Sequence, residues 1–170
     1  MRVLNFFISC LAAVTLTSCA SYRLGSVNGT VAGEKSITVL PFNNQTLQPR
    51  LGAALTQSLR ERLQVDGTYR LATHGDGDLV ISGVIQTYHR EGLGYFSADV
   101  ATPENYRVGV IVHVTVRART SGKLLLEKDV KGHTLVRIGS DLVSAERQIV
   151  PLLAEDLARN VTALLTEGSR

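Results

Sequence analysis

The sequence contains no tryptophan, and only 5% of its residues are aromatic. Proteins that bind single-stranded nucleic acid stack the bases on aromatic rings, and this chain lacks such a platform. The formal net charge is also small, at +3 for the whole chain. Because nucleic-acid-binding domains are usually strongly basic, the composition speaks against a nucleic-acid partner.

The motifs of the common enzyme classes are missing as well. The sequence has no nucleophile elbow, no glycine-rich phosphate loop and no His-Glu-x-x-His stretch. His74, Asp76 and Asp78 look like a fragment of a metal loop, but no closing glutamate follows at the spacing that a calcium loop requires. We therefore predict no enzyme, no cofactor and no metal ion, and a periplasmic hydrolase has no motif in its favour.

Cysteine is nearly absent, with two residues in the whole chain, Cys10 and Cys19. A basic residue at position 2, an apolar run from Phe6 to Leu16 and small residues after it describe a secretory signal peptide. The run falls short of the ~20 residues that cross a bilayer. The stretch Leu16-Thr17-Ser18-Cys19 resembles the lipobox of bacterial lipoproteins, in which the cysteine is acylated and becomes the new N-terminus. The alternative is an ordinary signal peptide with a chance cysteine.

Lipidation of Cys19 would leave no free thiol in the mature chain, which excludes disulfides, thiol catalysis and cysteine-ligated metals. The residue after Cys19 is Ala20, whereas in lipoproteins of this type an aspartate there often marks retention in the inner membrane. The resemblance therefore implies the periplasmic side of an outer membrane. Loss of Arg2 with the signal leaves 17 basic and 15 acidic residues.

We expect three parts in the chain: a signal peptide over 1–18, a lipidated N-terminus with a flexible tether over 19–36, and a single domain over 37–170. The tether is rich in Gly, Ser and Thr and shows no apolar period. About 150 residues remain after cleavage, which is enough for one domain with a real core.

The clearest periodic signal lies between Tyr106 and Arg119, where the even positions are apolar and the odd positions are mostly polar or basic. A period of two predicts a strand with one buried face. A second strand, with Leu124, Leu126 and Val130 at even positions, follows the turn 120–122.

The parity of the two strands predicts their register. The apolar even-numbered residues of both strands must share the buried face. Ala118 should therefore pair with Leu124 across a three-residue loop. Such loops favour glycine at the last, left-handed position, and Gly122 stands there.

The remaining elements complete an α+β fold. We expect a first strand over 37–42 with a turn over 43–46, a brief strand over 68–72, a strand from Leu79 up to Arg90 and a long loop over 91–105. One helix has Pro49 in its first turn, a leucine stripe (51, 55, 59, 63) and an end at Asp66-Gly67; another starts at Ser140-Asp141 and is kinked or restarted at Pro151. The economical arrangement is a two-layer sandwich, in which two helices pack on one face of a mostly antiparallel sheet of about four strands.

The order of these elements resembles the lipopolysaccharide-assembly lipoprotein family, LptE. The resemblance covers the lipobox, Tyr22-Arg23-Leu24, the strand over 37–42, the leucine-rich helix, the stretch 78–83, the strand from Tyr106, the hairpin and the closing helix. It implies an outer-membrane lipoprotein that acts as plug and assembly partner of a β-barrel translocon of the LptD type and helps to insert lipopolysaccharide in the outer leaflet. The stretch Val39-Leu40-Pro41-Phe42 is also similar to the opening strand of curli-secretion lipoproteins, and a ring-forming secretion or envelope-integrity lipoprotein is the alternative.

Basic residues gather on the odd-numbered face of the predicted sheet. Arg can bind phosphate through its planar fork, and lipopolysaccharide carries phosphates and acidic sugars. We therefore predict a lipopolysaccharide-binding face made by Arg107, Arg117, Arg119, Lys123 and Lys131, with His113 among them. The alternative is a solvated face on which Glu127 and Asp129 serve as cross-strand partners, opposite Thr115 and His113.

The predicted loop over 91–105 carries two aromatic residues, Tyr95 and Phe96. Exposed aromatic side chains on a loop can dock a partner protein. The alternative is that both rings fold back on the sheet.

Overall fold

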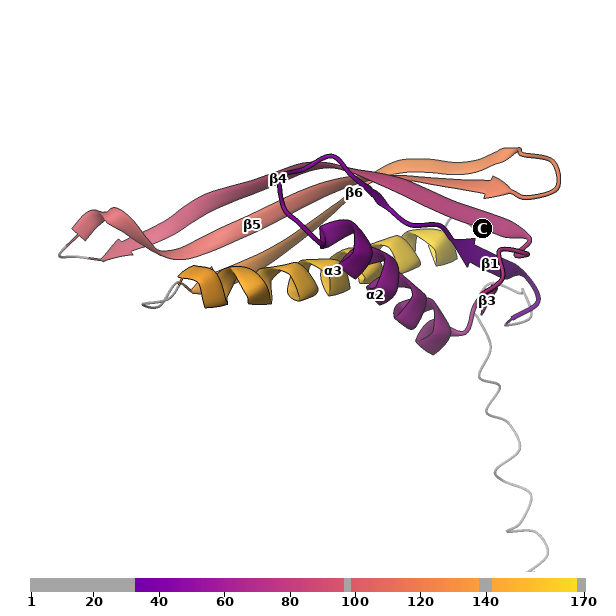
Figure 1. The fold of residues 1–170 in the computed structure, drawn as a ribbon, viewed down its shortest axis with the longest axis horizontal. Helices are drawn as coiled ribbons and strands as arrows, with labels where there is room; N and C mark the ends of the chain where they lie inside the picture. Colours follow the sequence, from indigo (N-terminus) through magenta and orange to yellow (C-terminus); the bar gives the residue numbers. More distant parts are fainter. Residues whose placement is uncertain (1–32, 97–98, 138–141, 168–170) are drawn as a thin grey trace, which may run out of the picture.

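The computed structural model describes residues 33–96, 99–137 and 142–167. They form two layers, a long sheet and a pair of helices on one of its faces (Figure 1). The strands are β1 (Ser36–Val39), β2 (Asn43–Asn44), β3 (Arg70–Leu71), β4 (Leu79–Phe96), β5 (Asp99–Ala118) and β6 (Leu124–Arg137), and the helices are α2 (Leu51–Asp66) and α3 (Leu142–Glu167). The predicted two-layer α+β sandwich is confirmed.

The sheet is larger than predicted and has mixed strand directions. It has six strands in the order β3-β1-β4-β5-β6, with β2 also paired to β4. β1 and β2 run parallel to β4, and β3 runs parallel to β1, whereas β4, β5 and β6 are antiparallel. The expectation of about four mostly antiparallel strands is wrong in number and direction. α2 links β1 to the strands that follow, and such a helical crossover returns the chain in a parallel direction.

The predicted loop over 91–105 is wrong, because β4 and β5 continue through it as paired strands. Their pairing extends from Leu79 opposite Ala118 to Tyr95 opposite Pro103. A β-bulge lies between Ile85 and Thr87, where one extra residue enters β4. Beyond the bulge, residues 89–91 are all exposed and the hairpin continues past the helices, so no buried face marks this part of the strand as a period of two in the sequence.

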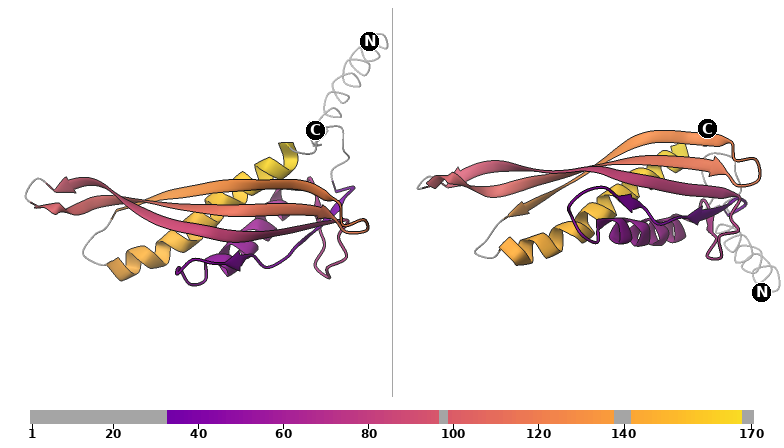
Figure 2. Two further views of the ribbon diagram at one scale, coloured as in Figure 1. Left: turned by 90° about the horizontal axis from the view of Figure 1, so that it is seen from above. Right: turned by 45° about the horizontal axis from the view of Figure 1, so that its top comes forward.

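The long strands reach beyond the helices. β5 has 20 residues, roughly 65 Å of extended chain, whereas the 26 residues of α3 span about 39 Å. Figures 1 and 2 show the β4–β5 hairpin projecting past α3 at one end and the β5–β6 turn at the other. Among the described residues, no helix is both long and apolar enough to span a membrane.

The core lies between the even-numbered face of β5 and the two helices. The valines at 108, 110, 112, 114 and 116 are at most 2% exposed, and the four leucines at 51, 55, 59 and 63 are fully buried. Both predicted stripes are therefore confirmed. α3 adds its own buried row and runs through Pro151 as one helix, so of the two predicted alternatives, a kink or a restart, the restart is wrong.

The ends of α2 agree with the sequence in part. The helix begins at Leu51, so Pro49 lies ahead of it rather than in its first turn, and Arg50 takes a left-handed φ of 65°. Gly67 ends the helix as predicted, with a φ of 72° and its N–H donated to the Leu63 carbonyl. The predicted start of the last helix, Ser140-Asp141, includes residues outside the described part of the chain.

The β5–β6 hairpin has the predicted register except beside its turn. Val112 lies opposite Val130 and Val116 opposite Leu126, as parity requires. At the turn the register shifts by one residue, and Arg117 lies opposite Leu124. The pairing of Ala118 with Leu124 is therefore wrong, because Leu125 enters as an extra residue. Gly122 does take the left-handed conformation, with a φ of 65°.

Side chains of helix α3 bond to backbone groups on the free edge of β6, the last strand of the sheet. The His133 backbone N–H donates to Asp156 Oδ2 at 2.9 Å, and Asn160 Nδ2 donates to the Lys131 carbonyl at 2.9 Å. The helix comes this close because Gly132 lies under it, where a Cβ would stand 2.5 Å from Leu157 Cγ. Two backbone groups that would otherwise face outward are thus satisfied by side chains.

Candidate functional site

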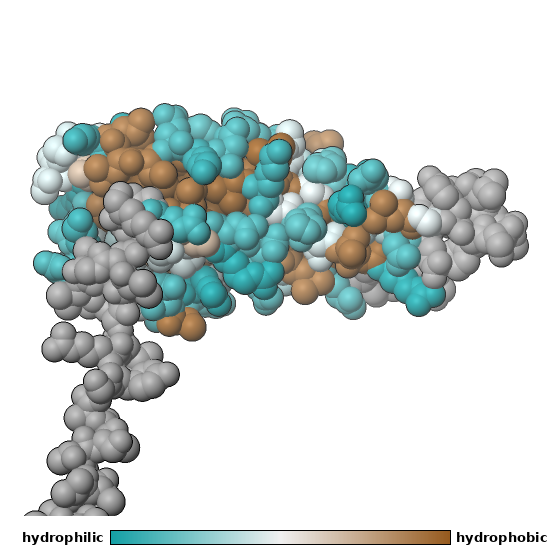
Figure 3. Space-filling view, turned by 180° about the vertical axis from the view of Figure 1, so that it is seen from behind, coloured by the Kyte–Doolittle hydropathy of each residue, from teal (hydrophilic) through white to brown (hydrophobic). Residues whose placement is uncertain are grey.

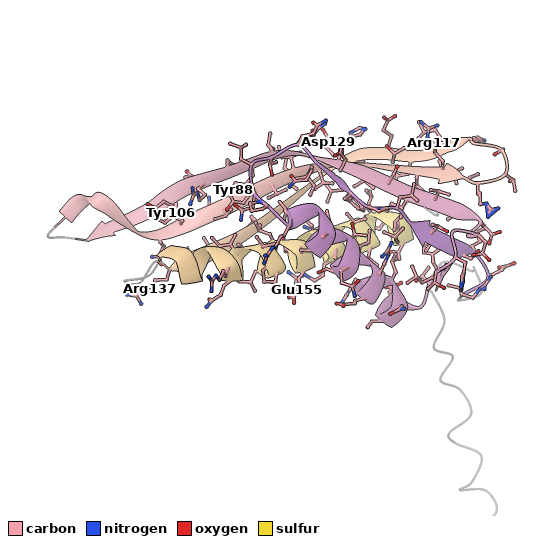
Figure 4. All side chains as sticks on the ribbon, in the orientation of Figure 1. Tyr88, Tyr106, Arg117, Asp129, Arg137 and Glu155 are labelled. Atoms are coloured by element: carbon pink, nitrogen blue, oxygen red, sulfur yellow. The ribbon has the colours of Figure 1, made fainter. Side chains whose placement is uncertain are left out.

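The candidate site is the sheet face that neither α2 nor α3 covers, which we call the outer face. It carries the odd-numbered side chains of β5 and the residues opposite them on β4 and β6. Figure 4 shows Arg117 and Asp129 pointing away from the helices, whereas Glu155 projects from α3 on the other side of the molecule. All five predicted ligand residues lie on this face or in the turn that ends it.

Cross-strand pairing arranges the outer face in rows from β4 through β5 to β6. From the β5–β6 turn toward the far hairpin, the rows are Val80–Arg117–Leu124, Ser82–Thr115–Glu127, Val84–His113–Asp129, Thr87–Ile111–Lys131, His89–Gly109–His133 and Glu91–Arg107–Leu135. Residues directly opposite each other share a face and lie within contact distance. The rows therefore show which charges meet.

His113 lies between two carboxylates at the centre of the outer face. Its Nδ1 is 2.7 Å from Asp129 Oδ1, and its Nε2 is 3.0 Å from Glu127 Oε1. The hydrogen bond with Asp129, and then the one with Glu127, raises the pKa of His113 above its ordinary value. The two acids lie opposite His113 and Thr115, as expected, and both turn to the histidine.

Arg107 has an acidic partner that the sequence did not reveal. Its Nη1 is 3.7 Å from Glu91 Oε2, with about half of each side chain exposed. The sequence points only to Glu127 and Asp129 as acidic partners on this face, and Glu91 falls in the predicted loop. An exposed pair of this length contributes little stability, but it partly satisfies the charge of Arg107.

Three cations gather where β5 turns into β6, and we call Arg117, Arg119 and Lys123 the tip cluster. Arg117 Nη1 donates to the Gly122 carbonyl at 3.3 Å, and Arg119 Nη1 donates to the Gly75 carbonyl at 3.2 Å. Within the described residues, none of the three forms an ion pair with a carboxylate. The tip cluster is therefore a group of exposed positive charges that acidic side chains do not neutralise.

The five predicted ligand residues do not form a single site. Arg107 lies ten residues along β5 from Arg117, roughly 33 Å away. Lys131 is opposite Ile111, between these ends, and is exposed. The structure therefore brings together three of the five residues and leaves the other two further along the same face.

Tyr95 and Phe96 belong to the end of β4 rather than to a loop. Their backbones pair with Pro103 and Asp99 near the end of the β4–β5 hairpin. Their side chains lie outside the described part of the structure, so their role as a partner contact stays a prediction.

Asp78, from the stretch that looked like a fragment of a metal loop, has a structural role. Its Oδ2 accepts hydrogen bonds from the Ser36 hydroxyl at 2.6 Å and the Ser36 N–H at 2.9 Å. These hydrogen bonds lower the pKa of the Asp78 carboxyl and tie β1 to the start of β4. No cluster of three or more His, Cys, Asp or Glu suited to a metal ion occurs among the described residues.

Sequence reasoning missed the apolar side chains beside the tip cluster. Leu124 was assigned to the buried face, yet it is 39% exposed and its neighbour Leu125 is 49% exposed. The cause is the register shift at Leu125, which the alternation of the sequence does not announce. The available signal was the run of three consecutive leucines at 124–126, which breaks the alternation of apolar and polar residues.

Comparison with known proteins identifies the relatives of this fold. The family model described as LptE, lipopolysaccharide-assembly, matches residues 34–165. A solved structure from Xanthomonas campestris has a TM-score of 0.58 at 8% identity, over 79% of this chain and 85% of the other. A hypothetical protein of Chlamydia trachomatis has a TM-score of 0.56 at 11% identity, over 79% and 97% of the two chains. A minor lipoprotein of Acinetobacter baumannii has a TM-score of 0.53 at 12% identity, over 78% and 93%.

At these identities the solved structures establish a shared fold and nothing further. A search of curated protein sequences gives no match.

Proposed function

This chain belongs to the LptE lipopolysaccharide-assembly family, and on that basis we propose that it is a lipoprotein anchored through Cys19 on the periplasmic side of the outer membrane. There it acts, without catalysis, as plug and assembly partner of an LptD-like β-barrel translocon and helps to insert lipopolysaccharide in the outer leaflet. The role requires surfaces that bind a ligand and a partner, rather than a catalytic centre.

The observation that carries the ligand part of the proposal is the tip cluster. Its three cations lie in or beside one turn, and none of them forms an ion pair with a carboxylate of the described residues, so no ion pair within that part of the chain offsets the repulsion between their like charges. An anionic ligand would relieve that repulsion, and two of the three side chains are arginines, which can grip a phosphate with paired hydrogen bonds. Lys131 and Arg107 extend the basic surface along β5, and Arg107 contributes less because Glu91 is near.

The shape of the sheet suits a partner that surrounds the protein. The β4–β5 hairpin extends beyond the helices (Figure 2), so its end, with Tyr95 and Phe96, can reach a neighbouring protein without interference from α3. The ring-forming alternative needs the β5–β6 hairpin to offer its apolar face to a membrane. That face is already buried against the helices, and we find no observation on the described residues that favours a ring.

The tip cluster is tested by the double substitution Arg117→Gln/Arg119→Gln in the mature lipoprotein. Both side chains are exposed, so the melting temperature should not change. Binding to purified lipopolysaccharide should weaken about tenfold at low salt and less at high salt, because charge-assisted contacts are lost and screening reduces their weight. The matched control Arg62→Gln/Arg147→Gln removes two exposed charges from the helices and should bind as the wild type does. If the tip variant binds lipopolysaccharide at low salt as tightly as the wild type does, the proposal that the tip cluster binds the ligand is refuted.

The partner is tested by isolating the tagged, lipidated protein in mild detergent. Recovery of a large β-barrel protein in a stoichiometric amount supports the plug. Recovery of a closed ring of identical chains would replace it with the secretion-type alternative.

A further inference from the structure

A groove lies between the two helices, on the side of the molecule from which Glu155 projects (Figure 4). We call it the interhelical groove. Its volume is about 230 Å³, and its lining includes Glu61, Arg62 and Val65 of α2 and Glu155, Ala158 and Arg159 of α3. Sites for small molecules usually have roughly 300–1,000 Å³, so the interhelical groove suits one or two side chains of a peptide instead.

The interhelical groove has apolar surface at its base and at one end. Ala158 is 1% exposed, whereas Val65 is 80% exposed and lies in the last turn of α2. A single exposed valine is ordinary on a protein surface. This valine, however, lines a cavity, so an apolar side chain seated in the groove would cover it and be covered in return.

The described chain starts beside the end of α2 that carries Val65. The Gly33 N–H donates to the Thr68 carbonyl at 3.1 Å, and Thr68 follows Val65 by three residues. From Gly33 back to Leu24 is nine residues, which reach about 30 Å when extended. From Val65 to Glu61 is one turn of helix, about 6 Å. The segment that precedes Gly33 is therefore long enough to lie along the interhelical groove.

That segment contains one basic residue with a large apolar residue on each side. Within residues 20–32, Arg23 is the one charged residue, and it stands between Tyr22 and Leu24. The other residues of the segment are alanine, serine, glycine, asparagine, threonine and valine. The stretch Tyr22-Arg23-Leu24 thus offers two large apolar side chains and one positive charge, which the proposed function does not use.

The rim of the interhelical groove has an acidic excess of one charge. Arg159 Nη2 is 2.8 Å from Asp156 Oδ1, so this pair is neutral. Glu61, Glu155 and Arg62 form no ion pair among the described residues, and two negative charges and one positive charge sum to −1. One basic residue from another segment would balance this charge.

A second apolar area lies where β5 turns into β6 and α3 ends (Figure 3). It adjoins the tip cluster, whose positive charges would repel Arg23. The interhelical groove joins apolar surface to an acidic excess and lies beside the start of the described chain, so it matches the segment better.

We infer that the interhelical groove receives the stretch Tyr22-Arg23-Leu24 of the same chain. Leu24 would contact Val65 and Ala158, and Arg23 would lie at the acidic rim. Only residues 20 and 21 would then separate the docked stretch from Cys19. The helices would be held close to the membrane and the outer face would be turned away from it. The inference goes beyond the proposed function and takes from it only the lipid on Cys19.

The test is disulfide formation within the full mature lipoprotein, purified in mild detergent and treated with a mild oxidant. Cys10 leaves with the signal peptide and Cys19 carries lipid, so Leu24→Cys/Val65→Cys has two thiols. The matched control is Leu24→Cys/Ala53→Cys, because Ala53 is exposed on α2 but does not line the groove. The first pair should form an intrachain disulfide about tenfold faster than the control, since docking raises the local concentration of one thiol at the other. The mass of the unreduced chain measures both rates.

The charge of Arg23 gives a second readout. Adding Arg23→Glu to the first pair should slow the disulfide about fivefold at low salt and less at high salt, because the new carboxylate faces an acidic rim. Adding Glu61→Lys as well should restore most of the rate. A rate that ignores both changes would overturn the contact of Arg23 with the rim.

Three results would overturn the docking itself: equal rates for the two cysteine pairs, no disulfide in either, or disulfides that join two chains instead of forming within one. In the last case the groove takes the segment of a second copy. These measurements use neither lipopolysaccharide nor the barrel protein. Their failure would leave the proposed function standing, and loss of the ligand proposal would leave the docking standing.

Discussion

Val112 offers the sharpest test of which sheet face is buried. It lies near the middle of β5, is fully buried, and pairs with Ile85 on one side and Val130 on the other. Val112→Asp would place a carboxyl group within the cluster of buried apolar residues to which Val112 belongs. We expect a large loss of stability without a change in any residue of the outer face.

The magnitude follows from two contributions. Losing the burial of the valine side chain costs about 1.5–3 kcal/mol. A buried carboxyl without a hydrogen-bond partner costs a further ~1–3 kcal/mol, even if it takes up a proton. Together they approach 4 kcal/mol, a large part of the roughly 5–15 kcal/mol that stabilises a typical domain. Val112→Ala isolates the first contribution and should cost about 2 kcal/mol.

The assay is urea unfolding of the mature lipoprotein, followed by far-ultraviolet circular dichroism. The matched control is Ile111→Asp, one residue away on the outer face, half-buried and opposite Lys131. Its free energy of unfolding should fall by only about 1 kcal/mol, because the new carboxylate would be solvated and would lie opposite Lys131. Aspartate at His113 is a poorer control, since Asp129 and Glu127 already lie beside it. Equal unfolding midpoints for the variants at 111 and 112 would refute the face assignment.

Two further predictions concern the anchor and the central histidine. Cys19→Ser should abolish signal cleavage by the lipoprotein peptidase and shift the protein out of its membrane fraction; an unchanged mature mass and fractionation would contradict lipidation. His113→Asn should remove a stabilising contribution that depends on pH, because the pKa of His113 is raised in the folded protein. Relative to this variant, the wild type should be more stable at pH 5.5, and its advantage should fall as the pH rises above about 6.5 through the folded pKa. Urea unfolding at pH 5.5 and 8.5 measures both, and an advantage that grows with pH would contradict the geometry around His113.

The elements that the sequence predicted well are those whose packing repeats along the chain. β5 is buried on one face from Val108 to Val116, so its valines recur there at every second position, and the leucines of α2 recur at every fourth. The bulges at Gln86 and Leu125 had no such signal, because one extra residue changes the alternation without requiring a particular residue type. β2 and β3 have two residues each, which is too short for a period.

The candidate site was predictable as a face but not as a set of contacts. The period of two that predicted the buried even-numbered residues of β5 also placed its basic odd-numbered residues together on the opposite face. Which charges meet depends on the register of strands distant in sequence, and this is why Glu91 beside Arg107 was missed. The exposure of Leu124 depends on a local register shift, so only the structure could show that the tip is apolar as well as basic.

The covered part of the β6 edge bears on the proposed lipid anchor. Such an anchor would confine the copies of the chain to a thin layer, where collisions between neighbours are frequent and their orientations are restricted. A bare strand edge under such crowding is a template on which the sheet of one copy adds to the sheet of the next. In β6 the N–H of His133 and the carbonyl of Lys131 are already bonded to Asp156 and Asn160 of the same chain. The two side chains lie four residues apart on one helix, so a single turn of α3 occupies these two backbone groups, and the sheet of a second copy could not pair with them.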